Sequence, residues 1–323
     1  MSDREEKTGK NDNGKKNKGG KRNKIVAIEM IILVLLIMAA VTIFIQRDKS
    51  VKEAAKIHNQ KAKKTEQTPQ AAQKENEIEE ETEGTEEENG DRDASVPDRS
   101  NFAVQPGVSV GTTEQSDEKI VYLTLDDGPS DNTQAVLDIL DKYNAKATFF
   151  VTGEMPEYKD MIKAAYDKGH TIGMHTYSHD YAKVYASVDA YFQDLDQIGQ
   201  MVQEEIGYVP CFIRFPGGSS NTVSKKYTAG IMSTLVQEVQ NRGYQYYDWN
   251  GSSGDGSVRT TEELVAQATS FDSNNIILLC HDSHGKQTTV EALPQIIEYY
   301  QSLGYTFKAL DRDSFVAHHG VNN

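Results

Sequence analysis

Cysteine and tryptophan are nearly absent from this chain of 323 residues, which contains two Cys and one Trp. Two cysteines exclude a disulfide-rich fold and any zinc motif built from several cysteines. Basic residues are also in the minority, because 34 Lys and Arg stand against 49 Asp and Glu, a formal net charge of −15. A nucleic-acid partner is therefore not expected, since proteins that bind nucleic acid present a basic face to the phosphates.

Sequence signatures of several enzyme classes are missing as well. No GxGxxG follows the first predicted strand and no GxxxxGK[ST] occurs, so nothing supports a phosphate-binding loop for a nucleotide. No GxSxG elbow joins a predicted strand to a helix. A Ser–His hydrolase built on Asp282, Ser283 and His284 is therefore only a minor alternative.

The residues that are present divide the chain unevenly. Residues 1–24 carry nine Lys and Arg against four acids, which predicts a disordered basic tail. Residues 25–45 are predominantly apolar and Glu29 is the only charged residue among them. As a helix they would span about 31 Å, enough to cross a bilayer core. The basic tail predicts that this run is an uncleaved, single-pass anchor of the cell membrane with its N-terminus in the cytoplasm. A cleaved signal peptide is the alternative.

We expect the rest of the chain to lie on the extracellular side. Residues 46–116 are polar, and eleven acids crowd between residues 75 and 93, which predicts an extended, disordered linker. Residues 117–312 contain both cysteines and the single Trp and are long enough for one core, so they form the expected folded domain. Residues 313–323 are expected to be a C-terminal tail.

Short apolar runs alternate with longer helical patterns throughout the expected domain. This alternation predicts an α/β fold with a mostly parallel sheet and helices outside, either as a barrel that is closed or nearly closed or as an open doubly wound sheet. The predicted strands are 120–125, 147–151, 171–174, 212–215, 244–249, 275–279 and 305–310. The predicted helices are 133–143, 158–167, 188–205, 224–242, 261–271 and 289–303.

Residue types suited to metal binding follow two of these strands. His175 and His179 are four positions apart, a spacing that would place both imidazoles on one face of a helix and let them share a metal ion. Two surface histidines are the alternative. Asp127, which follows the first strand, would supply a third ligand and leave positions open for water and substrate. Zinc suits this set best, and cobalt or manganese are alternatives.

Asp126 and Asp127 are adjacent carboxylates at the end of one predicted strand. Burying both without partners would be costly, so one on a metal and the other paired with Arg214 would satisfy the two charges. A polar turn, in which Gly128 and Pro129 are the turn formers, explains the same segment equally well.

His281 follows the near-continuous apolar strand at 275–279. If Asp255 lies beside it, the pKa of His281 would be raised, which suits a general acid. A structural histidine, hydrogen-bonded at the edge of a core, is the alternative.

Four motifs, in this order, resemble those of the NodB-type polysaccharide deacetylases: TLDDGPS at 124–130, HTYSH at 175–179, RFPGG at 214–218 and LCHD at 279–282. The resemblance covers residues 117–312. It implies a distorted, incomplete (β/α) barrel with mostly parallel strands, which binds a divalent metal, usually zinc. It also implies hydrolysis of the N-acetyl groups of amino sugars in a polysaccharide.

The resemblance assigns roles to seven residues of this sequence. They are the metal ligands Asp127, His175 and His179, the general base Asp126 with its partner Arg214, and the general acid His281 with its partner Asp255. A backbone N–H near Tyr177 or Ser178 is expected to help to stabilise the oxyanion.

This chain departs from the family pattern in two places that concern the site. Gly217 stands where an aromatic residue often follows RxP, which is expected to alter substrate contacts. Gly256 follows Asp255 where the family often has Trp, whereas Trp249 follows Asp248. Either Asp255 or Asp248 is therefore a candidate partner of His281.

The expected anchor would hold the domain near the cell wall, which favours peptidoglycan N-acetylglucosamine as the substrate. N-acetylmuramic acid, a chitin-like or poly-N-acetylglucosamine glycan and an acetyl ester as on xylan are the alternatives, and a non-catalytic wall-binding module is the alternative of another class. No protein partner is implied. Cys211 and Cys280 are expected to be free, buried thiols, with a disulfide between them as the alternative.

Overall fold

The computed structural model describes residues 99–323 of the chain. The tail expected at 1–24, the membrane anchor expected at 25–45 and most of the linker expected at 46–116 lie outside the described residues. Within residues 99–323, none of the helices is both long and apolar enough to cross a membrane.

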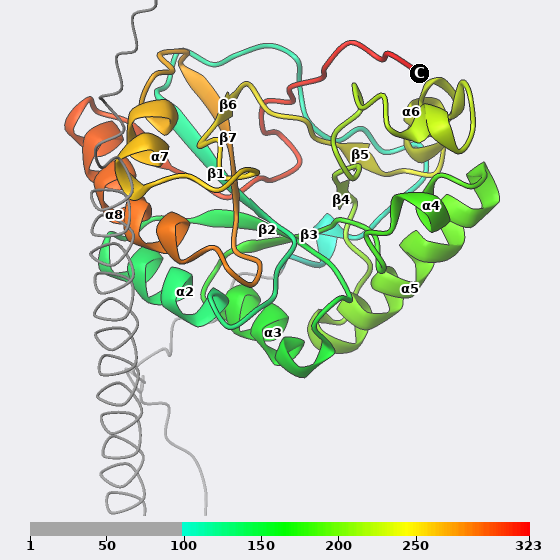
Figure 1. Ribbon diagram of the computed structural model, residues 1–323, viewed down its shortest axis with the longest axis horizontal. Helices are drawn as coiled ribbons and strands as arrows, with labels where there is room; N and C mark the ends of the chain where they lie inside the picture. The colour runs from blue at the N-terminus through cyan, green and yellow to red at the C-terminus, as the bar shows by residue number, and fades with distance from the viewer. Residues whose placement is uncertain (1–98) are drawn as a thin grey trace, which may run out of the picture. The chain divides into compact units, whose positions relative to one another are not determined.

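One sheet of eight strands, all paired in parallel, forms the centre of the fold (Figure 1). Seven strands follow one another in the order β5-β4-β3-β2-β1-β7-β6, and β8 pairs with β1. Among the described residues no pairing joins β5 to β6, so the sheet is an incomplete barrel, as expected. The strands are β1 (Ile120–Asp126), β2 (Ala147–Val151), β3 (Thr171–Met174), β4 (Phe212–Ile213), β5 (Gln245–Tyr246), β6 (Gly251–Ser252), β7 (Asn275–His281) and β8 (Thr306–Phe307).

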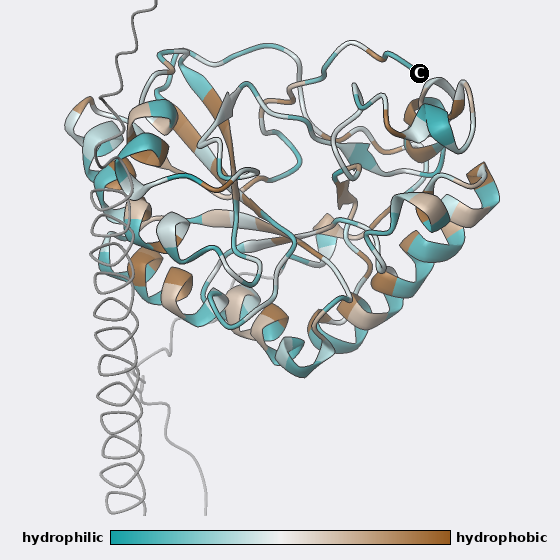
Figure 2. Ribbon diagram, in the orientation of Figure 1, coloured by the Kyte–Doolittle hydropathy of each residue, from teal (hydrophilic) through white to brown (hydrophobic). Residues whose placement is uncertain are grey.

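Strand β1 is buried on both faces, as its largely apolar sequence predicts. Successive side chains of a strand point to opposite faces. Val121, Leu123 and Leu125 pack in the cluster that also contains the buried sides of the helices. Ile120 and Tyr122 pack in a second cluster, on the concave side of the sheet. Figure 2 shows the resulting pattern, with hydrophobic residues on the strands and on the helix sides that face them.

Helices cover the convex side of the sheet (Figure 1). Except at 224–242, their positions agree with the predicted ones to within a few residues. The helices are α2 (Thr133–Lys142), α3 (Asp160–Asp167), α4 (Tyr181–Val184), α5 (Val188–Ile206), α6 (Ile231–Asn241), α7 (Thr261–Ala268) and α8 (Gln287–Ser302), with 3-10 turns η1 (Ser100–Phe102), η2 (Pro156–Tyr158) and η3 (Ser224–Lys226).

The single helix predicted over 224–242 is wrong. The segment contains the short turn η3 and then the helix α6, which begins only after Gly230. Gly230 has a φ of 77°, and a residue in this left-handed conformation cannot continue a right-handed helix. The short elements α4 and β6 were not predicted, because four and two residues carry too little periodicity to be recognised.

The folded unit extends beyond the expected domain at both ends. Before β1, Phe102 O accepts a hydrogen bond from Cys211 N–H at 2.9 Å. After β8, Val316 N–H donates to Thr112 O at 2.8 Å. The side chains of Phe102 and Val316 are buried in the concave cluster. The end of the expected linker and the expected C-terminal tail are therefore both part of the core.

Both cysteines are free and buried, as expected. Burial raises the pKa of the Cys211 thiol to about 11, and it raises the pKa of Cys280 further above the ordinary range. Thiols that stay protonated are poor nucleophiles, so both behave as small apolar side chains.

Candidate active site

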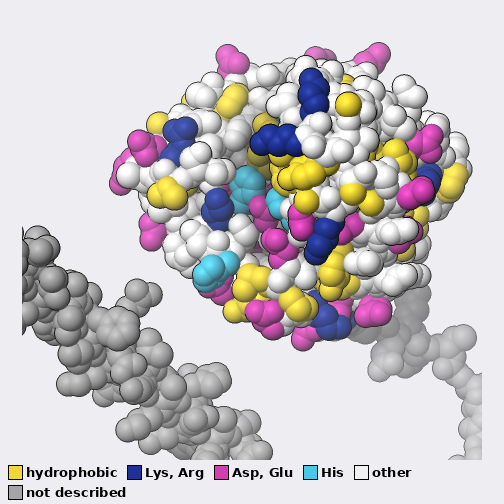
Figure 3. Space-filling view, turned by 45° about the vertical axis from the view of Figure 1, so that its right-hand side comes forward, with side chains coloured by type: hydrophobic (Ala, Val, Ile, Leu, Met, Phe, Trp, Pro, Cys, Tyr) yellow, Lys and Arg dark blue, Asp and Glu magenta, His cyan; other side chains and the backbone are white. Residues whose placement is uncertain are grey.

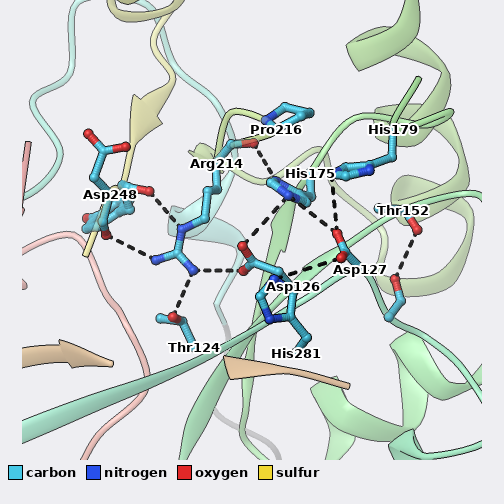
Figure 4. Close-up of polar contacts among 12 residues, drawn as sticks. Thr124, Asp126, Asp127, Thr152, His175, His179, Arg214, Pro216, Asp248 and His281 are labelled. Carbon is cyan, nitrogen blue, oxygen red and sulfur yellow. Dashed lines mark hydrogen bonds and ion pairs between the residues drawn. The ribbon is translucent and has the colours of Figure 1, made fainter. Parts of the chain in front are cut away.

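The chemically active side chains meet where several parallel strands end (Figure 4). Asp126 is the last residue of β1 and is paired in register with His281, the last residue of β7. His175 directly follows β3, and Arg214 directly follows β4. Because parallel strands end at the same edge of a sheet, the fold brings these residues together from distant parts of the sequence.

The segment from His175 to His179 is a loop, and the helix expected from the spacing of the two histidines is wrong. Thr176 and His179 have positive φ angles of 68° and 47°, which break regular helical structure. The loop nevertheless brings the two imidazoles together, with their ring centroids 4.9 Å apart.

Backbone strain is concentrated in this part of the described structure. Four residues other than glycine have a positive φ between residues 99 and 323, and three of them are Asp127, Thr176 and His179. Such conformations cost about 1–3 kcal/mol each and persist only where the surrounding structure enforces them, often at functional sites.

Asp127, His175 and His179, here called the triad, form a cluster that fits a divalent cation. Nε2 of His175 and Nε2 of His179 each lie 3.5 Å from Asp127 Oδ1. Three ligand atoms, one from each residue, lie within 4.8 Å of one another. Ligands of a tetrahedral zinc ion are separated by roughly 3.3–3.6 Å, so the two measured separations match. Asp127 Oδ1 is also buried without a hydrogen-bond partner, a deficiency that a cation would satisfy.

His175 is held in the form that a metal requires. Its Nδ1 lies 2.8 Å from Arg214 O. A carbonyl oxygen only accepts hydrogen bonds, so Nδ1 carries the proton and Nε2 presents its lone pair toward Asp127. Burial lowers the pKa of His175, which favours the neutral imidazole.

Arg214 is fully buried on the concave side, and each of its three nitrogens donates a hydrogen bond. Nη1 donates to Asp126 Oδ1 at 2.7 Å and to Thr124 Oγ1 at 2.8 Å. Nε donates to Tyr247 O at 2.8 Å, and Nη2 donates to Asp248 O at 3.1 Å. Because Arg214 binds Oδ1, the other carboxylate oxygen of Asp126, Oδ2, faces the triad. It lies 3.7 Å from Nε2 of His175.

His281 lies beside the triad, and Asp255 holds it there. Its Nδ1 lies 2.8 Å from Asp255 Oδ1, and its backbone N–H donates to Asp255 Oδ2 at 2.7 Å. Nε2 of His281 lies 3.9 Å from Asp127 Oδ2. Burial alone would lower the pKa of His281, but the hydrogen bond and charge of Asp255 outweigh it and raise this pKa to about 9.

Asp248 does not contact His281, and its carboxylate instead binds two backbone N–H groups. Its Oδ1 accepts a hydrogen bond from Ser219 N–H at 2.8 Å, and its Oδ2 accepts one from His319 N–H at 2.8 Å. The structure therefore decides between the two candidates that the sequence left open, because Asp255 supports His281 and Asp248 ties the turn at Ser219 to the C-terminal segment.

The N–H groups of Tyr177 and Ser178 are already engaged in the fold, so neither of these two is free to stabilise an oxyanion. Both donate to Asp194 Oδ1, at 2.6 Å and 3.0 Å. Asp194 was missed in the sequence. The feature that could have revealed it is its position, because Asp194 is an acidic residue on the apolar face of α5, between the buried residues Tyr191 and Ile198.

Gly217, where the family pattern often has an aromatic residue, has a φ of 74°. A Cβ atom at this position would lie 2.5 Å from Tyr181 Oη. The Tyr181 ring in turn packs edge-on against His179, with centroids 5.8 Å apart. An aromatic side chain from α4 therefore occupies the space beside the triad that a side chain at position 217 would need.

The site opens to solvent on one face of the molecule. Figure 3 shows histidine and acidic side chains together in a hollow, with apolar and basic side chains around it. His179 and Asp127 keep 23% and 20% of their side-chain surface exposed, whereas Asp126 keeps only 3%. A substrate can therefore reach the triad, while the Asp126–Arg214 pair lies beneath it.

Comparisons with known proteins agree with this geometry. Residues 113–236 match the family model described as polysaccharide deacetylase. A putative polysaccharide deacetylase of Bacillus subtilis, YheN, is 30% identical over 217 residues, which cover 64% of this chain and 72% of that protein. The chain belongs to the polysaccharide deacetylase family.

Two further relatives have more specific names. A peptidoglycan-N-acetylglucosamine deacetylase of Bacillus cereus is 29% identical over 226 residues, covering 65% of this chain and 78% of that protein. The crystal structure of the catalytic domain of a peptidoglycan N-acetylglucosamine deacetylase from Eubacterium rectale is 47% identical, with a TM-score of 0.63, and covers 65% of this chain and 97% of that domain.

Proposed function

We propose that this enzyme removes N-acetyl groups from the amino sugars of a cell-wall polysaccharide, and that its substrate is the N-acetylglucosamine of peptidoglycan. One observation carries the chemistry. A carboxylate held by a buried arginine and an imidazole held by a buried carboxylate both lie next to a triad that fits a metal ion. Amide hydrolysis needs a base for the attacking water and an acid for the departing amine, and this arrangement supplies both.

Asp127, His175 and His179 would hold the metal ion, with zinc as the proposed ion and cobalt or manganese as alternatives. When bound, a divalent cation polarises a carbonyl oxygen and lowers the pKa of water. The remaining tasks belong to the side chains around the triad.

Asp126 is the proposed general base. Its Oδ1 is fixed by Arg214, so Oδ2 is the oxygen that takes a proton from the attacking water. His281 is the proposed general acid. Its Nδ1–H is held by Asp255, so Nε2 gives its proton to the leaving amine, which could not depart as an anion.

Peptidoglycan is favoured by the names of the relatives, several of which are peptidoglycan-N-acetylglucosamine deacetylases. Other relatives are a chitin deacetylase of Arthroderma benhamiae and a bifunctional xylanase/deacetylase of Pseudobutyrivibrio xylanivorans. N-acetylmuramic acid, chitin-like glycans, poly-N-acetylglucosamine and acetyl-xylan therefore remain the alternative substrates. Our proposal for location, with residues 25–45 as the anchor and the catalytic domain outside, rests on the sequence alone.

The test is acetate release from purified peptidoglycan, chitin oligomers and acetyl-xylan, before and after treatment with a chelator. We expect release from peptidoglycan that stops when metal is removed and returns when zinc is added. His179→Ala, which deletes one ligand, should abolish release, and His284→Ala, an exposed histidine outside the triad, should leave it unchanged. Equal release by all samples would contradict the metal role.

A non-catalytic wall-binding module is the alternative of another class. Such a module would bind peptidoglycan and release no acetate, with or without added metal. Mass spectrometry of the digested product settles which sugar has lost its acetyl group, and loss from N-acetylmuramic acid alone would overturn the proposed substrate.

A further inference from the structure

The carboxylate of Asp194 touches neither the triad nor the two proton-transferring residues, yet it holds the loop that carries two of the three ligands. Its Oδ1 accepts from Tyr177 N–H at 2.6 Å and from Ser178 N–H at 3.0 Å, and its Oδ2 accepts from Ser178 Oγ–H at 2.6 Å. All three donors belong to the residues between His175 and His179.

This arrangement gives three hydrogen bonds to the carboxylate of a residue that is only 8% exposed. A buried charge is costly unless it is paired or hydrogen-bonded, and bonds from backbone N–H groups to an ionised carboxylate are stronger than bonds between neutral groups. Ser178 Oγ also accepts a hydrogen bond from Asp180 N–H at 3.3 Å. The chain is therefore held on both sides of His179.

The loop needs such a hold because its backbone is strained. Thr176 and His179, on either side of the two residues that Asp194 binds, both have positive φ angles. Residues other than glycine leave this conformation unless their surroundings enforce it. Without Asp194, His179 would lose the contacts that fix its backbone, and its Nε2 would no longer be held 3.5 Å from Asp127 Oδ1.

We propose that Asp194 is a positioning residue, which presets the loop between His175 and His179 so that both imidazoles can bind one metal ion. The inference rests on the proposed metal-dependent function and deepens it. It assigns the geometry of the metal site to a residue on α5, outside every motif that follows a strand. Residues that orient metal ligands typically change metal affinity 10- to 100-fold when they are mutated.

The experiment measures metal binding directly on the full-length chain. Zinc affinity is determined by competition with a chromophoric chelator, and the ligand geometry is followed by the absorption spectrum of bound Co²⁺. For Asp194→Ala we expect zinc affinity to fall about 10- to 100-fold and the Co²⁺ spectrum to change. Asp194→Asn keeps one oxygen that can accept from both N–H groups, so its loss of affinity should be smaller.

Asp196→Asn is the matched control, because Asp196 lies on the same helix, carries the same charge and is exposed. It should bind zinc like the wild type. If Asp194→Ala does not fold, Ser178→Ala, which removes one of the three donors, takes its place and should weaken zinc binding by a smaller factor.

The outcomes separate the two proposals. If the wild-type chain binds no divalent metal, the proposed function fails. If the wild type binds zinc and folded Asp194→Ala binds it equally well with an unchanged Co²⁺ spectrum, Asp194 only stabilises the fold and the positioning role is wrong. Recovery of affinity from Asp194→Ala to Asp194→Asn, with both variants folded, supports the positioning role.

Discussion

The convex and concave sides of the sheet are built from different kinds of residue. On the convex side, aliphatic and aromatic side chains of the strands and helices form one continuous apolar cluster. The concave side has a smaller apolar cluster, and next to it lies the fully buried Arg214, with Asp126 and Thr124 as partners. The two sides alternate along β1, where Leu123 and Leu125 point one way and Thr124 and Asp126 the other.

This difference shows how the fold separates stability from chemistry. An apolar cluster stabilises the folded state through many similar contacts, so each contact contributes only a modest part of the stability. A buried ion pair depends on individual partners, because removing one leaves the other charged and desolvated. We therefore expect substitutions of the buried polar residues on the concave side to affect activity and stability together, and substitutions of the apolar residues in the convex cluster to affect stability alone.

Arg214→Met should have the largest effect and is the strongest test of the concave side. Methionine fills part of the space but leaves Asp126 buried without its partner, and three other acceptors lose their donor. Breaking a buried pair in this way costs about 3–5 kcal/mol of unfolding free energy. Urea unfolding measures this loss, and acetate release should fall with it because the proposed base is no longer held.

Arg214→Lys is the control that keeps the positive charge but loses the arrangement of hydrogen-bond donors. Lysine keeps the positive charge but has one nitrogen in place of three, so it should restore part of the stability and little of the activity. A stable, fully active Arg214→Met variant would show that the concave side does not depend on this ion pair.

The next effect in size should come from Leu137→Ala on the convex side. Leu137 is fully buried on α2 within the large apolar cluster. Truncating a buried leucine to alanine costs about 2–5 kcal/mol, because apolar contacts are lost and a cavity remains. Urea unfolding should show this loss, whereas kcat/KM for acetate release at a temperature where the variant is folded should match the wild type. A tenfold loss of kcat/KM in the folded variant would contradict the separation of the two sides.

The sequence predicted the convex side well and the concave side in part. Strands such as Ala147–Val151 and Thr171–Met174 were predicted with their observed bounds, because runs of apolar residues between helical patterns are a local signal. The same strands predicted which polar residues converge, since the ends of parallel strands meet. The packing of Phe102 and Val316 into the concave side was not predicted, because those contacts join segments far apart in the sequence.

Two wrong predictions, one at the site and one elsewhere in the fold, have a common physical cause. The spacing of His175 and His179 fits a helix, yet the loop between them contains a left-handed residue at Thr176. The helix expected at 224–242 is interrupted in the same way at Gly230. A positive φ depends on partners elsewhere in the fold, such as Asp194 on α5, so local periodicity does not reveal it.

A smaller effect is expected from the contact between His281, the proposed general acid, and Asp255. It should appear as a change in the pH dependence of activity. The pKa of His281 is about 9, above its ordinary value of 6.5, because Asp255 stabilises the charged ring. The protonated ring is the active form of a general acid, so activity should fall as the pH rises through about 9. In Asp255→Asn the raised pKa is lost, and this alkaline limb should move to lower pH.

The same pair predicts how stability depends on pH. A raised pKa in the folded state gives stability that is fully present below pH 6.5 and is lost as the pH rises through about 9. Unfolding free energy measured between pH 6 and 10 should therefore decline in the wild type and decline less in Asp255→Asn. Parallel profiles for the two proteins would show that Asp255 does not set the protonation of His281.

The smallest effect is expected at the exposed rim of the concave site, where Gly217 and Tyr181 meet. Gly217→Ala places a Cβ atom 2.5 Å from Tyr181 Oη, in a backbone conformation with a φ of 74° that disfavours alanine by about 1 kcal/mol. The variant should shift Tyr181 beside the triad and lower kcat/KM a few-fold. Tyr181→Phe removes the clashing oxygen, and the next nearest atom, Asn221 Cβ at 3.2 Å, needs to move by only a few tenths of an ångström to accept a methyl group. The double variant should therefore lose less than the sum of the two single losses, and strictly additive losses would show that Tyr181 does not respond to position 217.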